Sequence, residues 1–255
     1  VVYCVGCNQG CYDCFADANV EHITCLRNPA VGREAECTIA KTEKPETVLV
    51  AGGGIGGLEA AIILKQRGHN PILCEASGKL GGQFVTAGEA PRKGEMKDAV
   101  LLMAKQAEKM GVDIRLNTPV TPAMIAEMKP HTLINAIGAE PIVVPVPGHD
   151  KAFVVNSHDV LNGKAAVTGK AVVVGGGNVA IDVARTASRC GAESVSMFCL
   201  EPRDKMPASE EEIAEALEED VTVSCGWGPK EILTENGKVT GIVFKRCVSV
   251  WDAEG

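Results

Sequence analysis

The sequence predicts an α/β fold built from two Rossmann-like dinucleotide-binding units, preceded by a small cysteine-rich segment. Residues 47–67 join a short apolar run to the glycine pattern G-x-G-x-x-G and then to a helical pattern. Residues 170–190 repeat this order with G-x-G-x-x-A, and four cysteines fall between residues 4 and 14. Because a Rossmann unit binds a dinucleotide at its glycine turn, two such turns predict two bound dinucleotides.

The composition and charge of the chain exclude several classes of function. Its 255 residues are 45% hydrophobic with a mean hydropathy of +0.08, which suits a folded protein with its own core. A formal charge of −8 and a pI near 5.2 argue against nucleic acid or an anionic membrane as a partner. We find no apolar run of about 18 residues and no signal-peptide pattern, so a cytoplasmic location is predicted.

The first glycine turn lies between a buried-strand pattern and a helical pattern. Gly52 permits the tight turn, Gly54 lets the backbone approach a pyrophosphate, and Gly57 lets the helix pack on its strand. The positive N-terminal end of that helix would face the phosphates. The second strand ends in Glu75, whose carboxylate would accept a hydrogen bond from a ribose 2′-hydroxyl. The alternative is a glycine-rich turn that binds nothing, and an acid at this spacing argues against it.

The N-terminal segment has the cysteine spacing of an iron–sulfur site. Cys4-x2-Cys7-x3-Cys11 is followed by Cys25 as the fourth ligand, with Cys14 as its substitute. A [4Fe-4S] cluster needs four thiolates, and short spacings place several soft ligands around one small volume. Zinc also accepts four thiolates, but structural zinc sites usually pair two C-x2-C units and the segment offers one. The remaining cysteines are interpreted as small buried apolar residues: Cys37, Cys74, Cys190, Cys199, Cys225 and Cys247.

The second glycine turn carries Gly175, Gly177 and Ala180 at the G-x-G-x-x-A positions. Its second strand is predicted to end near Glu201, where an acid would accept a hydrogen bond from the ribose of NADH and repel the 2′-phosphate of NADPH. Arg203 follows two residues later and could turn toward a phosphate. The acid at the strand end predicts that NADH is preferred over NADPH.

These motifs together resemble a known family. CVGCNQGC, ITCLRNPAVGREAE and the first glycine turn resemble the C-terminal portion of the iron–sulfur flavoenzymes that include 2,4-dienoyl-CoA reductase, enoate reductase and trimethylamine dehydrogenase. GGGNVAIDVAR and MPASEEE resemble the nucleotide domain of the glutamate synthase small subunit. The resemblance covers nearly the whole chain. It implies a [4Fe-4S] cluster on Cys4, Cys7, Cys11 and Cys25, and FAD on the first glycine turn.

Two further loops are implied by the resemblance to contact the flavin. SGKLGGQF resembles the family's second flavin loop, and TLINAIG resembles a motif that closes over the dinucleotide. The residues expected at the FAD site are Gly52, Gly54, Gly56, Gly57, Glu75, Ala76, Gly82, Gln83, Ala136 and Gly138. Those expected at the NAD site are Gly175, Gly177, Asn178, Val179, Ala180, Glu201 and Arg203. No side chain is predicted to act as a catalytic acid or base.

The expected domains are an iron–sulfur segment at 1–44, an incomplete FAD domain at 45–165 and an NAD(P) domain at 166–255. Members of the family carry an FMN-binding barrel before the cluster. The resemblance therefore implies part of a larger chain or oligomer, which serves a small-molecule redox substrate through a missing barrel or partner subunit. The expected function is electron transfer between NADH, FAD and a [4Fe-4S] cluster, since a flavin exchanges both electron pairs and single electrons. The alternatives are a non-catalytic ADP-binding module and a zinc-bound scaffold.

Overall fold

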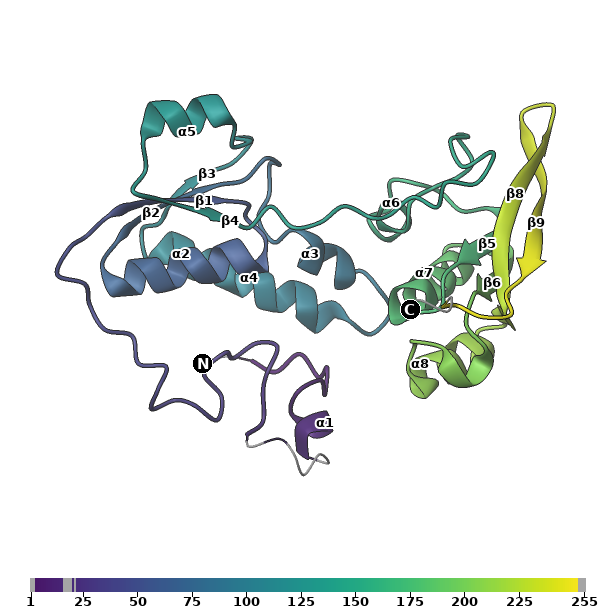
Figure 1. Cartoon of the computed structure of the whole chain (residues 1–255), viewed down its shortest axis with the longest axis horizontal. Helices are drawn as coiled ribbons and strands as arrows, with labels where there is room; N and C mark the ends of the chain where they lie inside the picture. Colours follow the sequence, from purple (N-terminus) through teal and green to yellow (C-terminus); the bar gives the residue numbers. More distant parts are fainter. Residues whose placement is uncertain (1–2, 16–19, 21, 252–255) are drawn as a thin grey trace. The chain divides into compact units, whose positions relative to one another are not determined.

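The computed structural model of the chain describes residues 3–15, 20 and 22–251. The chain divides into two compact units, Val1–Ala139 and Glu140–Gly255. Each unit contains a parallel sheet with helices packed against it, so the predicted α/β fold class is confirmed (Figure 1). The domain boundaries expected after residues 44 and 165 stay predictions.

The first unit is built on a parallel sheet of four strands in the order β3-β2-β1-β4. The strands are β1 (Thr47–Ala51), β2 (Asn70–Cys74), β3 (Asp113–Arg115) and β4 (Thr132–Asn135). Val48, Leu49 and Val50 in the central strand β1 are buried, as the continuous apolar run predicts for a strand covered on both faces. Because the strands are parallel, their carboxyl ends meet at one edge of the sheet, where a ligand crevice forms in folds of this class.

Three helices cover the faces of this sheet. α2 (Ile55–Arg67) and α4 (Gly94–Lys109) lie on one face, and α5 (Pro122–Met128) lies on the other (Figure 1). The apolar residues of α4 recur at helical spacing, and its buried face packs into the core with Val100 and Met103. α5 begins after the N-cap Thr121, whose hydroxyl accepts a hydrogen bond from the Met124 amide. A short helix, α3 (Gln83–Ala87), follows the loop at residues 77–82, which ends in Gly81 and Gly82.

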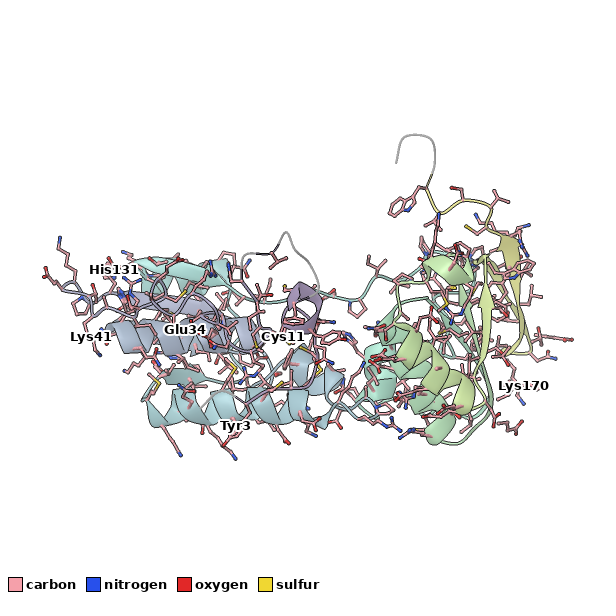
Figure 2. All side chains as sticks on the ribbon, turned by 90° about the horizontal axis from the view of Figure 1, so that it is seen from below. Tyr3, Cys11, Glu34, Lys41, His131 and Lys170 are labelled. Carbon is pink, nitrogen blue, oxygen red and sulfur yellow. The ribbon has the colours of Figure 1, made fainter. Side chains whose placement is uncertain are left out.

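The cysteine-rich segment precedes β1 and contains the short helix α1 (Tyr12–Phe15), with Cys11 next to it (Figures 1 and 2). Two interactions attach this segment to the helical layer of the first unit. The Arg27 Nη1 donates to the Met103 Sδ of α4 at 2.9 Å, and the Thr42 amide donates to the Arg67 carbonyl at the end of α2 at 2.8 Å. The segment is therefore held against the same helices that support the first glycine turn.

The second unit contains a parallel sheet in the order β5-β6-β7, formed by β5 (Gly169–Val174), β6 (Ala192–Cys199) and β7 (Thr222–Cys225). The helices are α6 (Ser157–Leu161), α7 (Asn178–Arg189) and α8 (Glu210–Glu218), with a 3₁₀ turn, η1 (Arg203–Lys205). Val195 and Met197 of β6 are buried in a core cluster with Ile181 of α7 and Ile213 of α8. The alternation along β6 thus directs every second side chain toward these helices.

A long hairpin, β8 (Trp227–Glu235) and β9 (Lys238–Arg246), follows the sheet. Asn236 and Gly237 both have positive φ at its tip, and an Asn-Gly pair favours such a two-residue turn. Phe244 of β9 stacks on Phe198 of β6, with ring centroids 4.0 Å apart. Because Phe198 alternates with the residues that face α7 and α8, this aromatic pair holds the hairpin on the opposite face of the sheet.

A buried ion-pair network joins α7 to α8. The guanidinium of Arg185, which is only 2% exposed, bonds the carboxylate of Glu215 and lies 2.8 Å from Glu219 Oε1. Arg189, one turn further along α7, also bonds Glu219 at 2.6 Å. These bonds, from Arg189 and then Arg185, lower the pKa of the Glu219 carboxyl to about 2 although partial burial opposes the shift. The network fixes the position of α8 on α7.

No helix in the described part of the chain combines the length and the apolar character needed to cross a membrane.

Candidate dinucleotide-binding sites

The first glycine turn connects β1 to α2 through positions that have no room for a side chain. Gly52 has φ +106°, and a Cβ atom there would lie 2.3 Å from the Ala136 carbonyl oxygen after β4. A Cβ atom at Gly57 would lie 1.9 Å from the Gly52 carbonyl oxygen. These contacts are closer than real Cβ atoms allow. Glycine is therefore required at position 57, where α2 packs against the turn, and at position 52, where the loop after β4 packs against it.

The other two loops expected at the flavin lie against the same turn. The Gly81 amide donates to the Gly53 carbonyl at 2.8 Å, and a Cβ atom at Gly82 would lie 3.0 Å from the Gly54 Cα. The Gln83 amide nitrogen donates to the Ala139 carbonyl, which ties the start of α3 to the segment after Gly138. The structure thus brings together three loops that are far apart in the sequence, which is the arrangement that a dinucleotide crevice needs.

Glu75 is held at the carboxyl end of β2 by two backbone donors. Its Oε2 accepts from the Gly53 amide at 2.7 Å, and its Oε1 accepts from the amide of Ser77, the residue after Ala76, at 2.8 Å. A carboxylate has about four lone-pair sites, so it can still accept from a ribose diol. The helix N-cap, Gly54, has no side-chain cap, and Gly56 has open space around its Cα, which leaves the amides of the first turn of α2 accessible to a pyrophosphate.

The second glycine turn has the same construction between β5 and α7. Gly175 has φ +148°, and a Cβ atom there would lie 3.0 Å from the Ala180 Cβ. Gly177 is the N-cap of α7 and also has no side-chain cap. A Cβ atom at Gly176 would lie 2.9 Å from Glu201 Oε2, and one at Gly53 would lie 3.0 Å from Glu75 Oε2. Both acids therefore approach the middle glycine of their own turn in the same way.

Two contacts join the second glycine turn to the segment that begins α8. The Asn178 side-chain oxygen accepts from the Ser209 amide at 2.9 Å, and the Ala208 amide donates to the Gly176 carbonyl at 3.1 Å. Ser209 also caps α8 by accepting from the Glu212 amide at 3.4 Å. Asn178 thus ties the start of α8 to the glycine turn, whereas Val179 beside it is exposed. The run MPASEEE, noted for its resemblance alone, was the signal for this contact.

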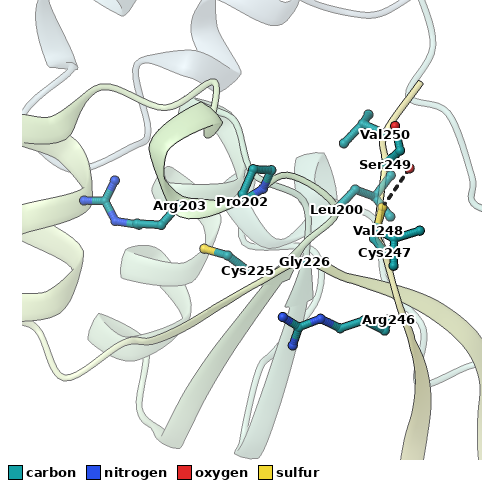
Figure 3. Close-up of a pocket in the computed structure, with 10 residues that line it drawn as sticks. All are labelled: Leu200, Pro202, Arg203, Cys225, Gly226, Arg246, Cys247, Val248, Ser249 and Val250. Carbon is teal, nitrogen blue, oxygen red and sulfur yellow. Dashed lines mark hydrogen bonds between the residues drawn. The ribbon is translucent and has the colours of Figure 1, made fainter. Parts of the chain in front are cut away.

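Arg203 lies at the same edge of the second sheet but is already paired. Its Nη1 and Nη2 bond the two carboxylate oxygens of Glu210 at 2.8 and 2.7 Å, and this bond raises the pKa of Arg203 while lowering that of Glu210. The residue also lines a cavity of about 280 Å³ at the ends of β6 and β7 (Figure 3). The other lining residues are Leu200, Pro202, Cys225, Gly226, Arg246, Cys247, Val248, Ser249 and Val250.

In the cysteine-rich segment, backbone amides donate to two of the expected ligand sulfurs. The Gly6 amide donates to Cys4 Sγ at 3.3 Å, and the Arg27 amide donates to Cys25 Sγ at 3.4 Å. The Thr24 amide bonds the Gly10 carbonyl at 2.8 Å, which joins the residues before Cys25 and Cys11. Such amide–sulfur bonds suit thiolates that hold a cluster. In the described residues, no three Cys, His, Asp or Glu side chains are grouped closely enough to hold a metal ion.

The interpretation of the scattered cysteines as buried apolar residues is correct for Cys74 and Cys199 and wrong for Cys37 and Cys190. Cys37 lies in a turn of the cysteine-rich segment and Cys190 is the C-cap of α7, so neither has a second layer of structure above it, and both are exposed. Cys225 and Cys247 are half-buried at the edge of the cavity.

A Rossmann-type α/β fold whose glycine turns are each approached by an acid from a strand end is the fold of a dinucleotide-binding protein. The chain belongs to the pyridine nucleotide-disulphide oxidoreductase family, whose sequence profile matches residues 46–247. This membership implies FAD and NAD(P) as cofactors. The loops at both turns fit such ligands, because their glycines leave room for a backbone approach and their carboxylates are positioned for a ribose.

Relatives of known activity confirm the resemblance to the dienoyl-CoA reductase group. The chain is 34% identical over 191 residues to the bilirubin reductase of Mediterraneibacter gnavus (strain CC55_001C), covering 75% of this chain and 30% of that protein. It is 33% identical over 190 residues to a cinnamate reductase of Clostridium sporogenes, covering 74% and 28%. A solved structure of a 2-naphthoyl-CoA reductase complex matches 96% of this chain and 38% of its own, with 27% identity and a TM-score of 0.83. The chain spans about a third of these relatives.

Proposed function

We propose that the chain is an electron-transfer module that passes electrons between NADH, FAD and a [4Fe-4S] cluster. One observation carries the proposal: the two acids, Glu75 and Glu201, approach the middle glycine of their own turns at nearly equal separations. A single turn would support one bound nucleotide. Two turns of matched construction in one chain support a pair of dinucleotides that exchange electrons with each other.

The residues of the chain act by binding and positioning in this proposal. The amides at the start of α2 and the carboxylate of Glu75 hold FAD, and those at the start of α7 with Glu201 hold NADH. Bound FAD supplies the chemistry that converts the electron pair of a nicotinamide into single electrons for a cluster. No side chain of the chain is assigned an acid or base role, because the bound cofactors would supply the redox chemistry.

A reduction experiment tests this function and its alternative, a non-catalytic module that holds ADP. The purified chain is incubated with FAD, freed of excess ligand and titrated with NADH without oxygen. We expect a visible flavin band that bleaches as NADH is added. A chain that retains ADP and shows no flavin band after incubation with FAD would establish the alternative.

Four cysteines of the N-terminal segment are proposed to bind the cluster: Cys4, Cys7, Cys11 and Cys25. Anaerobically prepared protein is expected to contain iron and acid-labile sulfide at about four of each per chain, because soft thiolates at this spacing select iron–sulfur. Cys25→Ser is expected to lose the cluster unless Cys14 replaces it, whereas Cys37→Ser, an exposed cysteine of the same segment, is expected to keep it. Zinc at about one per chain without sulfide would contradict the assignment.

NADH is the proposed donor at the second site because the charge around it opposes a 2′-phosphate. Glu201 carries the carboxylate beside the turn, and the guanidinium of Arg203 is occupied by Glu210. Glu201→Arg is expected to shift the ratio of the two dissociation constants toward NADPH by about tenfold, or about 1.4 kcal/mol. Glu193→Arg, at the start of β6, is the charge-matched control. Tighter binding of NADPH by the unmodified chain would show that the assignment of Glu201 is wrong.

The electrons are proposed to serve a flavin-dependent reductase or dehydrogenase on a further segment or a partner subunit. The support is the length of the relatives, of which the chain matches 30% and 28%. The names of these relatives say that they reduce bilirubin and cinnamate, two compounds of different chemistry. The portion that they share with this chain therefore suits a common function in supplying electrons.

The described cysteines form no disulfide, which suits a reducing compartment such as the proposed cytoplasmic location.

A further inference from the structure

Two cysteines outside the expected metal site face each other across the sheet of the second unit. Cys199 ends β6 and Cys225 ends β7, and the two are direct partners in the parallel register. Neighbouring strands lie about 4.8 Å apart, and a disulfide joins Cα atoms separated by about 4.4 to 6.8 Å. Register partners in a parallel pair also point their side chains to the same face of the sheet. The backbone therefore already holds the two thiols at a separation that a disulfide can span.

The two thiols interact and differ in their access to solvent. Burial raises the pKa of Cys199 to about 12, helped by a hydrogen bond with Cys225. Cys199 is 2% exposed, whereas Cys225 is half-buried and lines the cavity of about 280 Å³. Only Cys225 can thus be reached by a small molecule, and Cys199 lies behind it as a second thiol.

Cys225 opens onto the cavity at the ends of β6 and β7. Two guanidinium-bearing residues, Arg203 and Arg246, line it together with Cys225, and Figure 3 shows the Cys225 side chain extending toward the side on which Arg203 lies. Because Cys225 is partly exposed to this cavity, a small molecule can approach its sulfur. Cys247 also lines the cavity, but its thiol donates to the Ser249 carbonyl at 3.2 Å.

We propose that Cys199 and Cys225 form a reversible disulfide by exchange with a small-molecule disulfide such as oxidised glutathione. The Cys225 thiolate attacks one sulfur of the oxidant, which breaks the sulfur–sulfur bond and releases one glutathione. Cys199 then attacks the Cys225 sulfur, which breaks the mixed disulfide, and the Cys199 proton passes to the departing second glutathione. Two protein thiols are oxidised and one external disulfide is reduced to two thiols, so two electrons leave the protein.

The disulfide would lie beside the second nucleotide turn. The Cys199 Cβ is 2.8 Å from the position of a Cβ atom at Gly176, and the Cys199 thiol contacts the Glu201 carbonyl at 3.5 Å. Bonding to Cys225 draws the sulfur of Cys199 away from Glu201, the acid assigned to the ribose. The oxidised chain is therefore expected to bind NADH about fivefold more weakly, which is the effect of losing one hydrogen bond. This expectation rests on the proposed function.

Peptide mapping of thiols tests the proposal. The chain is equilibrated in glutathione buffers of increasing oxidised fraction, quenched in acid, alkylated and digested for mass spectrometry. We expect a peptide pair linked through Cys199 and Cys225 that disappears on reduction with dithiothreitol. Cys199→Ser is expected to stop at a glutathione adduct on Cys225, and Cys190→Ser, an exposed cysteine of the same unit, is expected to leave the linked pair unchanged.

Other results would overturn the proposal. Full alkylation of both thiols in the unmodified chain at high oxidised glutathione would exclude the disulfide, and a Cys225–Cys247 link would show that the wrong partner was assigned. NADH titration of the reduced and oxidised chains then separates the two inferences. Equal affinity would overturn the coupling to the nucleotide turn, whereas no NADH binding by the reduced chain would overturn the proposed function and leave the disulfide standing.

Discussion

Replacing Gly57 with alanine is expected to destabilise the first unit by about 3 kcal/mol and to abolish FAD retention. The added methyl group would lie 1.9 Å from the Gly52 carbonyl oxygen, a backbone atom that cannot rotate away. Relief of this contact requires α2 to move off β1, which opens the core around Leu58 and shifts the amides that would hold the pyrophosphate. Urea unfolding and flavin absorbance after gel filtration measure the two effects.

Gly56→Ala is the matched control for stability, because it adds the same methyl group one residue earlier in α2. No atom lies within 4 Å of a Cβ at Gly56, and alanine has a higher helix propensity than glycine. The urea midpoint of this variant is expected to equal or exceed that of the unmodified chain. A comparable loss of stability in both variants would show that the turn tolerates no alanine for reasons other than the contact with Gly52.

The features that could be predicted from the sequence are those fixed by local chemistry. The glycine turns at Gly52 and Gly175 require backbone angles and close approaches that few other residues allow. The helix α4 follows from its apolar period, and the hairpin tip follows from the pair Asn236-Gly237. In each case the cause lies within a few consecutive residues, so neighbouring sequence is enough to show it.

The features that could not be predicted depend on register and on packing between distant segments. Cys199 and Cys225 read as isolated apolar residues, because their facing positions arise only when β6 and β7 align in one particular register. Asn178 was expected at the nucleotide, and its bond to the Ser209 amide depends on how α8 folds back on the turn. Contacts between distant elements thus decide what surrounds each glycine turn.

The network around Arg185 is the clearest case of such a contact, because it joins residues of α7 to acids about 30 positions later in the chain. An unpaired guanidinium at 2% exposure would be strongly unfavourable, so the carboxylates of α8 are required for the arginine of α7 to be buried. Glu219 is central because it bonds both Arg185 and Arg189. The fold of the second unit therefore depends on a charge at this position.

Glu219→Gln is expected to lower the free energy of unfolding of the chain at neutral pH by about 1 to 2 kcal/mol, because it removes the negative charge that pairs with Arg185 and Arg189, while Glu215 stays bonded to Arg185. Urea unfolding measures this loss, and Glu218→Gln, an exposed acid on the same helix, is the control, with an expected change below about 0.5 kcal/mol. Equal losses in the two variants would refute the assignment.

The same variant is expected to change how stability depends on pH. The pKa of Glu219 is lowered from 4.5 to about 2 in the folded chain, so its ion pairs stabilise the fold fully above pH 4.5 and are lost as the pH falls toward 2. Water around this partly exposed carboxylate reduces the contribution to about 1 to 2 kcal/mol. Unfolding free energies measured between these two pH values should fall less steeply for Glu219→Gln than for the unmodified chain. Parallel curves would mean that the folded chain does not favour the charged form of Glu219.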